Sequence, residues 1–147
     1  MANPFHVSEA ASLALHTMMI LASHRRNTAL TTRRIAARIG ASQAHLAKVL
    51  QRLVRAGFVR SVRGPRGGFR LGKSPGEVSL LEIYELIEGP LSTATCYFGK
   101  PICGKKTCIF GGLLESIGVQ LREHLANTKL SDLVEGESRQ CARSERS

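Results

Sequence analysis

Three cysteines lie close together in the second half of the chain, at Cys96, Cys103 and Cys108. Thiolates grouped in this way bind metal ions or iron–sulfur clusters, or form redox-active pairs. Three glycines in or beside the stretch let the backbone turn its amides toward sulfur, and three lysines within it favour the thiolate form. The fourth cysteine, Cys141, lies in a polar tail, and we treat it as incidental.

The spacing of the three cysteines leaves three chemistries open. An iron–sulfur cluster needs thiolates on a loop with hydrogen-bond donors around the sulfurs, and it tolerates a fourth ligand that is not cysteine. A structural zinc site usually shows cysteines paired across two to four residues, which only the gap from Cys103 to Cys108 approaches. A thiol switch needs only two cysteines. The spacing favours the cluster over the zinc site and the thiol switch.

The cysteines occupy an irregular segment, residues 91–112, between two predicted helices. Ser79 and Glu82 have the spacing of a capping box, which opens a helix that ends near Gly89. A longer helix begins at Leu113, and an apolar residue recurs there every four positions. This stripe consists of Leu113, Ile117, Leu121 and Leu125. It is typical of core packing within one chain, of pairing between two chains, or of both.

Basic residues are concentrated in the first half of the sequence. The 147 residues include 21 Lys and Arg against 11 Asp and Glu, a net charge of +10. Residues 1–73 hold 13 of the basic residues and a single acid, Glu9, for a net charge of +12, whereas residues 74–147 have a net charge of −2. This segregation indicates a polyanionic partner. Nucleic acid is favoured over a membrane surface, because the basic half lacks a one-sided apolar helix face.

The basic half has the pattern of a winged helix. Three helices are predicted: the first over 8–25, a short one capped by Thr31 or Thr32 and ended by Gly40, and a third over 43–56. Residues 58–63 then alternate apolar and basic, and a glycine-rich turn leads into 69–71. This predicts a β-hairpin with arginines on both arms and at its tip.

In a winged helix the N-terminal end of the third helix enters the major groove, and the preceding helix braces the DNA backbone. We therefore expect the base-facing residues to be Ser42, Gln43, Ala44, His45 and Lys48. The residues expected to hold phosphates are Arg33, Arg34, Arg52, Arg55 and Arg60. On the wing, the residues expected to enter a minor groove are Arg63, Arg66 and Arg70.

Several of these stretches resemble the IscR/NsrR family of bacterial winged-helix regulators. They are residues 42–50 (SQAHLAKVL), 56–59 (AGFV), 63–73 (RGPRGGFRLGK), 78–89 and 130–134. The resemblance covers about residues 5–135, and its most specific part is the Arg-Gly-x-x-Gly-Gly-Phe wing. It implies a homodimeric transcription factor in which the long C-terminal helix pairs two subunits. It also implies that Cys96, Cys103 and Cys108 hold a [2Fe–2S] or [4Fe–4S] cluster.

The fourth cluster ligand is where the sequence departs from the family pattern. One branch of the family carries a histidine three residues after its last cysteine, and here that position is Gly111. The nitric-oxide-sensing branch uses a carboxylate from the first helix of the partner subunit, and the matching position here is Ser12. Glu9 lies one turn before Ser12 and His16 one turn after it on the same face. Both side-chain types bind iron, so the fourth ligand is expected to be Glu9 or His16, from this subunit or its partner.

Together these patterns predict a mainly α fold with a small β-hairpin. Residues 1–90 form the winged helix-turn-helix DNA-binding domain, with its wing at 58–72, and 91–112 the cluster-binding loop. A dimerisation helix and C-terminal segment occupy 113–134, and 135–147 form a polar tail.

The predicted function is a transcriptional regulator, a repressor, that binds double-stranded operator DNA as a homodimer. Its affinity would depend on an iron–sulfur cluster that senses nitric oxide, redox state or iron–sulfur status. The alternatives are a cluster-free thiol or zinc switch on the same DNA-binding head, and a non-specific architectural DNA-binding protein. An electron carrier would leave the wing arginines without a role.

No nucleophile–base pair or paired carboxylates stand out, so we expect neither an enzyme nor a small-molecule substrate. No apolar run is long enough for a membrane span, and the first residues lack the pattern of a signal peptide. We therefore expect a cytoplasmic protein that associates with the nucleoid through DNA.

Overall fold

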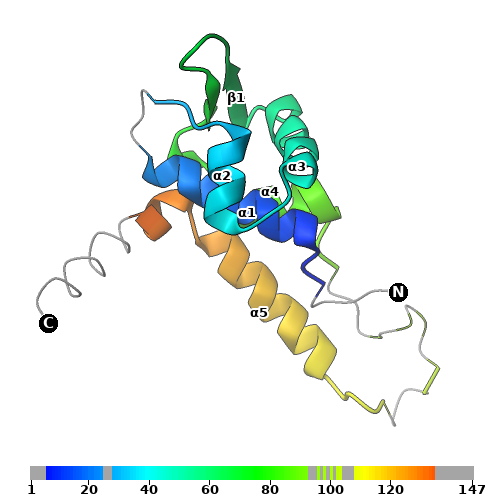
Figure 1. Ribbon diagram of the computed structural model, residues 1–147. Coiled ribbons are helices and arrows are strands. Elements are labelled where there is room, and N and C mark those ends of the chain that lie inside the picture. Colours follow the sequence, from blue (N-terminus) through cyan, green and yellow to red (C-terminus); the bar gives the residue numbers. More distant parts are fainter. Residues whose placement is uncertain are drawn as a thin grey trace, which may run out of the picture.

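The computed structural model describes residues 6–24, 28–92, 96, 98, 100, 102, 103 and 108–134. In this part of the chain the fold is mainly helical with one two-stranded hairpin, as predicted (Figure 1). The elements are α1 (Glu9–Ser23), α2 (Thr32–Ile39), α3 (Gln43–Arg55), β1 (Val59–Val62), β2 (Gly68–Leu71), a 3₁₀ turn (Pro75–Glu77), α4 (Leu80–Glu88) and α5 (Leu113–Asn127). The predicted tail at 135–147, with Cys141, lies outside the described residues.

Side-chain caps fix the starts of four helices. Ser8, Thr31 and Ser42 accept hydrogen bonds from backbone N–H groups in the first turns of α1, α2 and α3. Thr31 is therefore the cap of α2, and Thr32 is its first residue. At α4 the capping box is complete, since the Ser79 hydroxyl accepts from Glu82 N and Glu82 Oε2 accepts from Ser79 N at 2.8 Å. This backbone hydrogen bond lowers the pKa of the Glu82 carboxyl from its ordinary value.

The first and third helices end slightly earlier than predicted. Helix α1 ends at Ser23, two residues before the predicted boundary, and α3 ends at Arg55. Gly40 and Gly57 follow α2 and α3 with positive φ angles of 74° and 79°. Glycine adopts this left-handed conformation without a steric penalty, so the two glycines end the helices where the sequence indicated.

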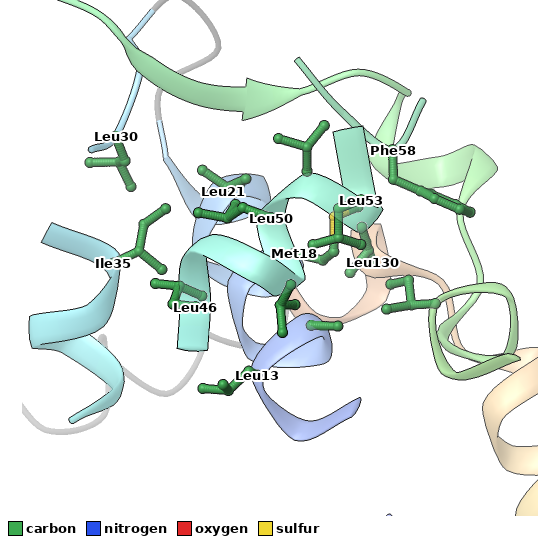
Figure 2. Close-up of a cluster of buried hydrophobic side chains, with 14 of the residues drawn as sticks. Leu13, Met18, Leu21, Leu30, Ile35, Leu46, Leu50, Leu53, Phe58 and Leu130 are labelled. Carbon is green, nitrogen blue, oxygen red and sulfur yellow. The ribbon is translucent and has the colours of Figure 1, made fainter. Parts of the chain in front are cut away.

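The main core lies between α1, α2, α3 and the base of the hairpin. Figure 2 shows leucines of α3 facing Met18 of α1 and Ile35 of α2, all of them buried. Leu130 is also in this cluster with no exposed surface, although it follows α5 in the chain. Leu130 N donates to Val78 O at 3.0 Å, which fixes the segment after α5 against the residues that precede α4. The C-terminal segment therefore closes the core of the N-terminal domain.

The wing is an antiparallel pair in which Arg60 lies opposite Arg70 and Ser61 opposite Phe69. Leu30 extends it, because Leu30 and Phe69 exchange backbone hydrogen bonds of 2.9 and 2.7 Å. A Cβ at Gly68 would lie 2.5 Å from Leu30 O, and Gly68 has a φ of +147°. A Cβ at Gly67 would lie 2.4 Å from Val62 O. The two consecutive glycines of the wing are therefore required by close backbone approach and by conformation.

Helix α5 extends away from the rest of the fold (Figure 1). Its C-terminal half packs on the chain, where Leu125 and Leu121 contact a small cluster with Ala11, Tyr84 and Leu91. Its first residue, Leu113, is 54% exposed. The predicted apolar stripe is thus buried at its C-terminal end and exposed at its N-terminal end. Its role in pairing two subunits stays a prediction.

Among the residues that the structure describes, no helix is both long and apolar enough to span a membrane.

Candidate DNA interface and cysteine segment

The N-terminal end of α3 is open to solvent. Ser42, Gln43, Ala44 and Lys48 are exposed, and His45 is half-buried. The tight turn after Gly40 sets α2 beside this end, and both Arg33 and Arg34 are exposed on α2. Those of these side chains that are exposed, at the start of α3 and on α2, are therefore accessible to a ligand. Their contact with DNA stays a prediction.

The wing carries four exposed arginines, Arg60, Arg63, Arg66 and Arg70, on its arms and turn. In the part of the chain that the structure describes, none of them has an acidic side chain within ion-pair distance. Their positive charge is uncompensated there, which suits a polyanionic partner.

A contact that sequence reasoning missed joins α1 to the start of α3. Nδ1 of His45 lies 3.4 Å from Oε1 of Glu9, with the side chains 36% and 74% exposed. Glu9 is the only acidic residue before position 74, so this contact places the single carboxylate of the basic half beside the expected base-reading end of α3. Glu9 was also a candidate cluster ligand, and in this structure its carboxylate faces His45.

Arg52 has a partner that was not foreseen. Its Nη2 atom donates to the carbonyl oxygens of Leu86 (2.8 Å) and Ile87 (3.2 Å), in the last turn of α4. Helix α4 has no basic residue in that turn, so an arginine from α3 interacts with the negative end of its dipole. The backbone N–H of Gly89 caps this end by donating to Glu85 O, and nothing in the sequence pointed to the further contact with Arg52. A phosphate contact by Arg52, as predicted, would compete with this structural role.

Cys96 and Cys103 are half-buried, and Cys108 is exposed. Cys96 Sγ donates to Lys100 O at 3.0 Å. Among the described residues, no three His, Cys, Asp or Glu side chains are grouped closely enough to hold a metal ion. The structure therefore shows the thiols in one segment without bringing them together, and it brings neither Glu9 nor His16 to them. His16 Nδ1 instead lies 2.7 Å from Ser12 O on the exposed face of α1.

The cysteine segment starts from a point that is fixed to two helices. Leu91 N donates to Glu85 Oε1 at 3.0 Å, and the same oxygen lies 3.6 Å from Arg122 Nη1 on α5. Large apolar side chains then lie exposed along the segment and at the start of α5. They are Phe98, Ile102, Ile109, Phe110 and Leu113. Such a concentration of exposed apolar surface is typical of an interaction site.

Comparison with known proteins points to one family. Residues 7–136 match the Rrf2 family model, which is described as an iron-dependent transcriptional regulator. The chain is 30% identical over 128 residues to the HTH-type transcriptional regulator NsrR of Bacillus subtilis, covering 82% of this chain and 84% of that one.

Solved structures agree with this match. CymR, the global cysteine regulator of B. subtilis, superposes with a TM-score of 0.73 at 25% identity, covering 89% of this chain and 97% of that one. IscR of T. potens superposes with a TM-score of 0.71 at 25% identity, covering 90% and 88%. These relatives are regulators rather than enzymes, in agreement with the sequence prediction.

Proposed function

Because the chain belongs to the Rrf2 family of transcriptional regulators, we propose that it is a homodimeric repressor whose operator affinity depends on an iron–sulfur cluster. The observation that carries the DNA-binding part is the exposed start of α3 together with a wing that has four uncompensated arginines. In this proposal α3 reads the major groove, and the wing arginines reach a neighbouring minor groove.

Three residues would hold the cluster: Cys96, Cys103 and Cys108. Their chemistry fits, since they are three cysteines in one segment, and thiolates are the ligands that iron–sulfur clusters require. Glu9 or His16 of either subunit remains the candidate for the fourth ligand. A cluster held in this way supplies iron sites that react with nitric oxide or oxidants, and these are the signals we propose. The names of the relatives IscR and NsrR support the proposal of an iron–sulfur cluster and of these signals.

A chain of contacts connects the cysteine segment to the DNA-reading helix. Leu91, where the segment begins, is bonded to Glu85 of α4, and Glu85 pairs with Arg122 of α5. One residue further along α4, the Leu86 carbonyl accepts from Arg52 of α3. A change in the order of the segment would therefore move the end of α4, and through Arg52 it would move α3.

In a homodimer the two α3 helices must lie about 34 Å apart to read successive turns of DNA. A coupling of about 1–3 kcal/mol between the cysteine segment and this spacing is enough to change operator affinity about 5- to 150-fold.

Anaerobic purification tests the cluster. We expect coloured protein that contains iron and acid-labile sulfide, and a Cys103→Ala variant that has lost most of both. The DNA affinity of the loaded wild type should differ from that of the variant at the same salt concentration. A colourless protein without iron or sulfide would exclude the cluster and leave the thiol or zinc switch, which zinc analysis and thiol titration would then separate.

Sequence discrimination tests the regulator against the architectural alternative. A DNA selected from a random pool should bind at least about 1000-fold more tightly than unrelated DNA at physiological salt. Equal affinities with a steep salt dependence would indicate phosphate contacts alone.

A further inference from the structure

A pocket lies at the base of the wing, where the C-terminal end of α1 meets β2 and the residues that follow it. Its volume is about 320 Å³. This is at the lower end of the range for small-molecule sites, about 300–1,000 Å³. The pocket is remote from the cysteine segment in sequence, since its lining residues fall within 21–28 and 60–75.

Three of the side chains that line the pocket are cationic. Arg60, Arg70 and Lys73 line it, and none of the lining residues is acidic. Arg60 and Arg70 lie directly opposite each other in the hairpin, an arrangement in which like charges destabilise the strand pair. Among the residues that the structure describes, neither arginine has an acidic partner. Lys73 lies over the ring of Phe58, 4.2 Å from its centroid, which holds this third cation near the pocket without neutralising it.

Apolar residues, among them Leu21 of the core, also line the pocket. Leu21, which is 5% exposed, and Ala22 contribute the end of α1, and Pro75 contributes the turn after β2. Gly72 is fixed in the lining, because a Cβ there would lie 2.4 Å from Gly57 O. A bare inorganic anion would leave these apolar residues uncovered, and an uncharged apolar molecule would leave the cations unpaired.

We propose that this pocket binds a small organic anion, with its phosphate or carboxylate group between Arg60, Arg70 and Lys73 and its apolar part against Leu21 and Ala22. The occupant relieves the repulsion between the two cross-strand arginines and thereby stabilises the hairpin. The pocket gives the wing a ligand of its own, separate from the cysteines. If the wing holds DNA through Arg60 and Arg70, as the proposed function states, the anion competes with DNA for these two side chains.

Calorimetric titration of the DNA-free protein tests the site, at constant ionic strength and with three probes. Phenyl phosphate carries both the anion and an apolar ring, inorganic phosphate lacks the ring, and phenol lacks the anion. We expect saturable binding of phenyl phosphate, at least about fivefold tighter than either of the other two, because burying a ring against apolar residues adds about 1 kcal/mol or more.

Two variants distinguish a built site from a diffuse basic surface. Arg70→Gln removes an exposed side chain that lines the pocket, and we expect it to weaken phenyl phosphate binding at least about fivefold, since a charge-assisted hydrogen bond to the anion is lost. Arg38→Gln removes one exposed charge of α2 that does not line the pocket, and it should leave the affinity unchanged.

Three results would overturn the proposal: no saturable binding, equal weakening by both variants, or phenyl phosphate binding no better than inorganic phosphate. The last would mean that the cations serve only as a contact for a phosphate of the DNA backbone. Because the titrations contain neither DNA nor iron, their failure leaves the proposed regulation by the cysteine segment untouched.

Discussion

Replacing Arg52 by glutamine tests whether this arginine stabilises the fold or holds DNA. Its two hydrogen bonds, 2.8 and 3.2 Å, reach carbonyls at the end of α4. Bonds of a charged group contribute about 1.5–3 kcal/mol when sheltered from solvent, and a cation at a helix C-terminus about 0.3–1 kcal/mol. Because Arg52 is exposed, solvent screening reduces these values, and we expect the free energy of unfolding to fall by about 1 kcal/mol.

The matched control is Arg55→Gln, three residues further along α3. Arg55 is exposed too, and among the described residues it has no hydrogen bond to α4. Urea unfolding at one protein concentration should show the loss for Arg52→Gln and a change within about 0.5 kcal/mol for Arg55→Gln. The slope of log affinity for DNA against log salt should fall by about 1 for Arg55→Gln and stay constant for Arg52→Gln. Unchanged stability together with a reduced slope for Arg52→Gln would refute the assignment and make Arg52 a phosphate contact.

Three further substitutions probe the wing, the capping box and the base-reading end of α3. Gly68→Ala should lower the free energy of unfolding by at least about 2 kcal/mol in a urea titration. The new Cβ would lie 2.5 Å from Leu30 O, and the φ of +147° is strained for alanine. An unchanged unfolding midpoint would contradict the close approach of Gly68 to Leu30. Glu82→Gln should have a lower free energy of unfolding than the wild type at neutral pH, and this difference should disappear as pH falls below about 4.5. The reason is that the folded-state pKa of Glu82 lies below its ordinary value, so that the stabilisation by the carboxylate is lost on protonation. A difference that is constant between pH 3 and 7 would argue against this role of Glu82. Gln43→Ala should weaken binding to a selected operator by about 1–3 kcal/mol in fluorescence anisotropy and leave binding to unrelated DNA unchanged, whereas an equal loss on both DNAs would place Gln43 on the backbone.

Local signals in the sequence were sufficient for the elements of the DNA-binding half. The helices capped by Ser42 and Ser79 begin where predicted, since a short hydroxyl before an apolar periodic run can satisfy the first backbone N–H groups. The consecutive glycines of the wing also predicted a tight turn, although the reason for Gly68, its approach to Leu30, needed the structure.

Contacts between residues distant in sequence could not be predicted from the sequence. Arg52 and Leu86 are 34 residues apart, and nothing in the spacing shows that an exposed arginine of α3 meets the end of α4. The same holds for the Glu9–His45 pair and for the burial of Leu130 in the main core. The periodicity of α5 likewise gave the helix and its apolar positions, but it did not show that Leu125 packs on the chain while Leu113 lies exposed.

For the cysteine segment, the sequence was more informative than the structure. Its composition pointed to metal chemistry more clearly than the structure does, because ligands on a loop are brought together by the group they bind. The side chains of Cys96, Cys103 and Cys108 agree with the donor set, and their grouping around a cluster stays a prediction.

One comparison of DNA affinity tests most directly whether the iron–sulfur cluster controls operator binding. Anaerobically purified protein that contains iron and sulfide is titrated with a selected operator by fluorescence anisotropy, before and after removal of the cluster, at a single salt concentration. We expect the affinity to change by about 5- to 150-fold, as for a coupling of about 1–3 kcal/mol between two sites. Equal affinities before and after removal would contradict it.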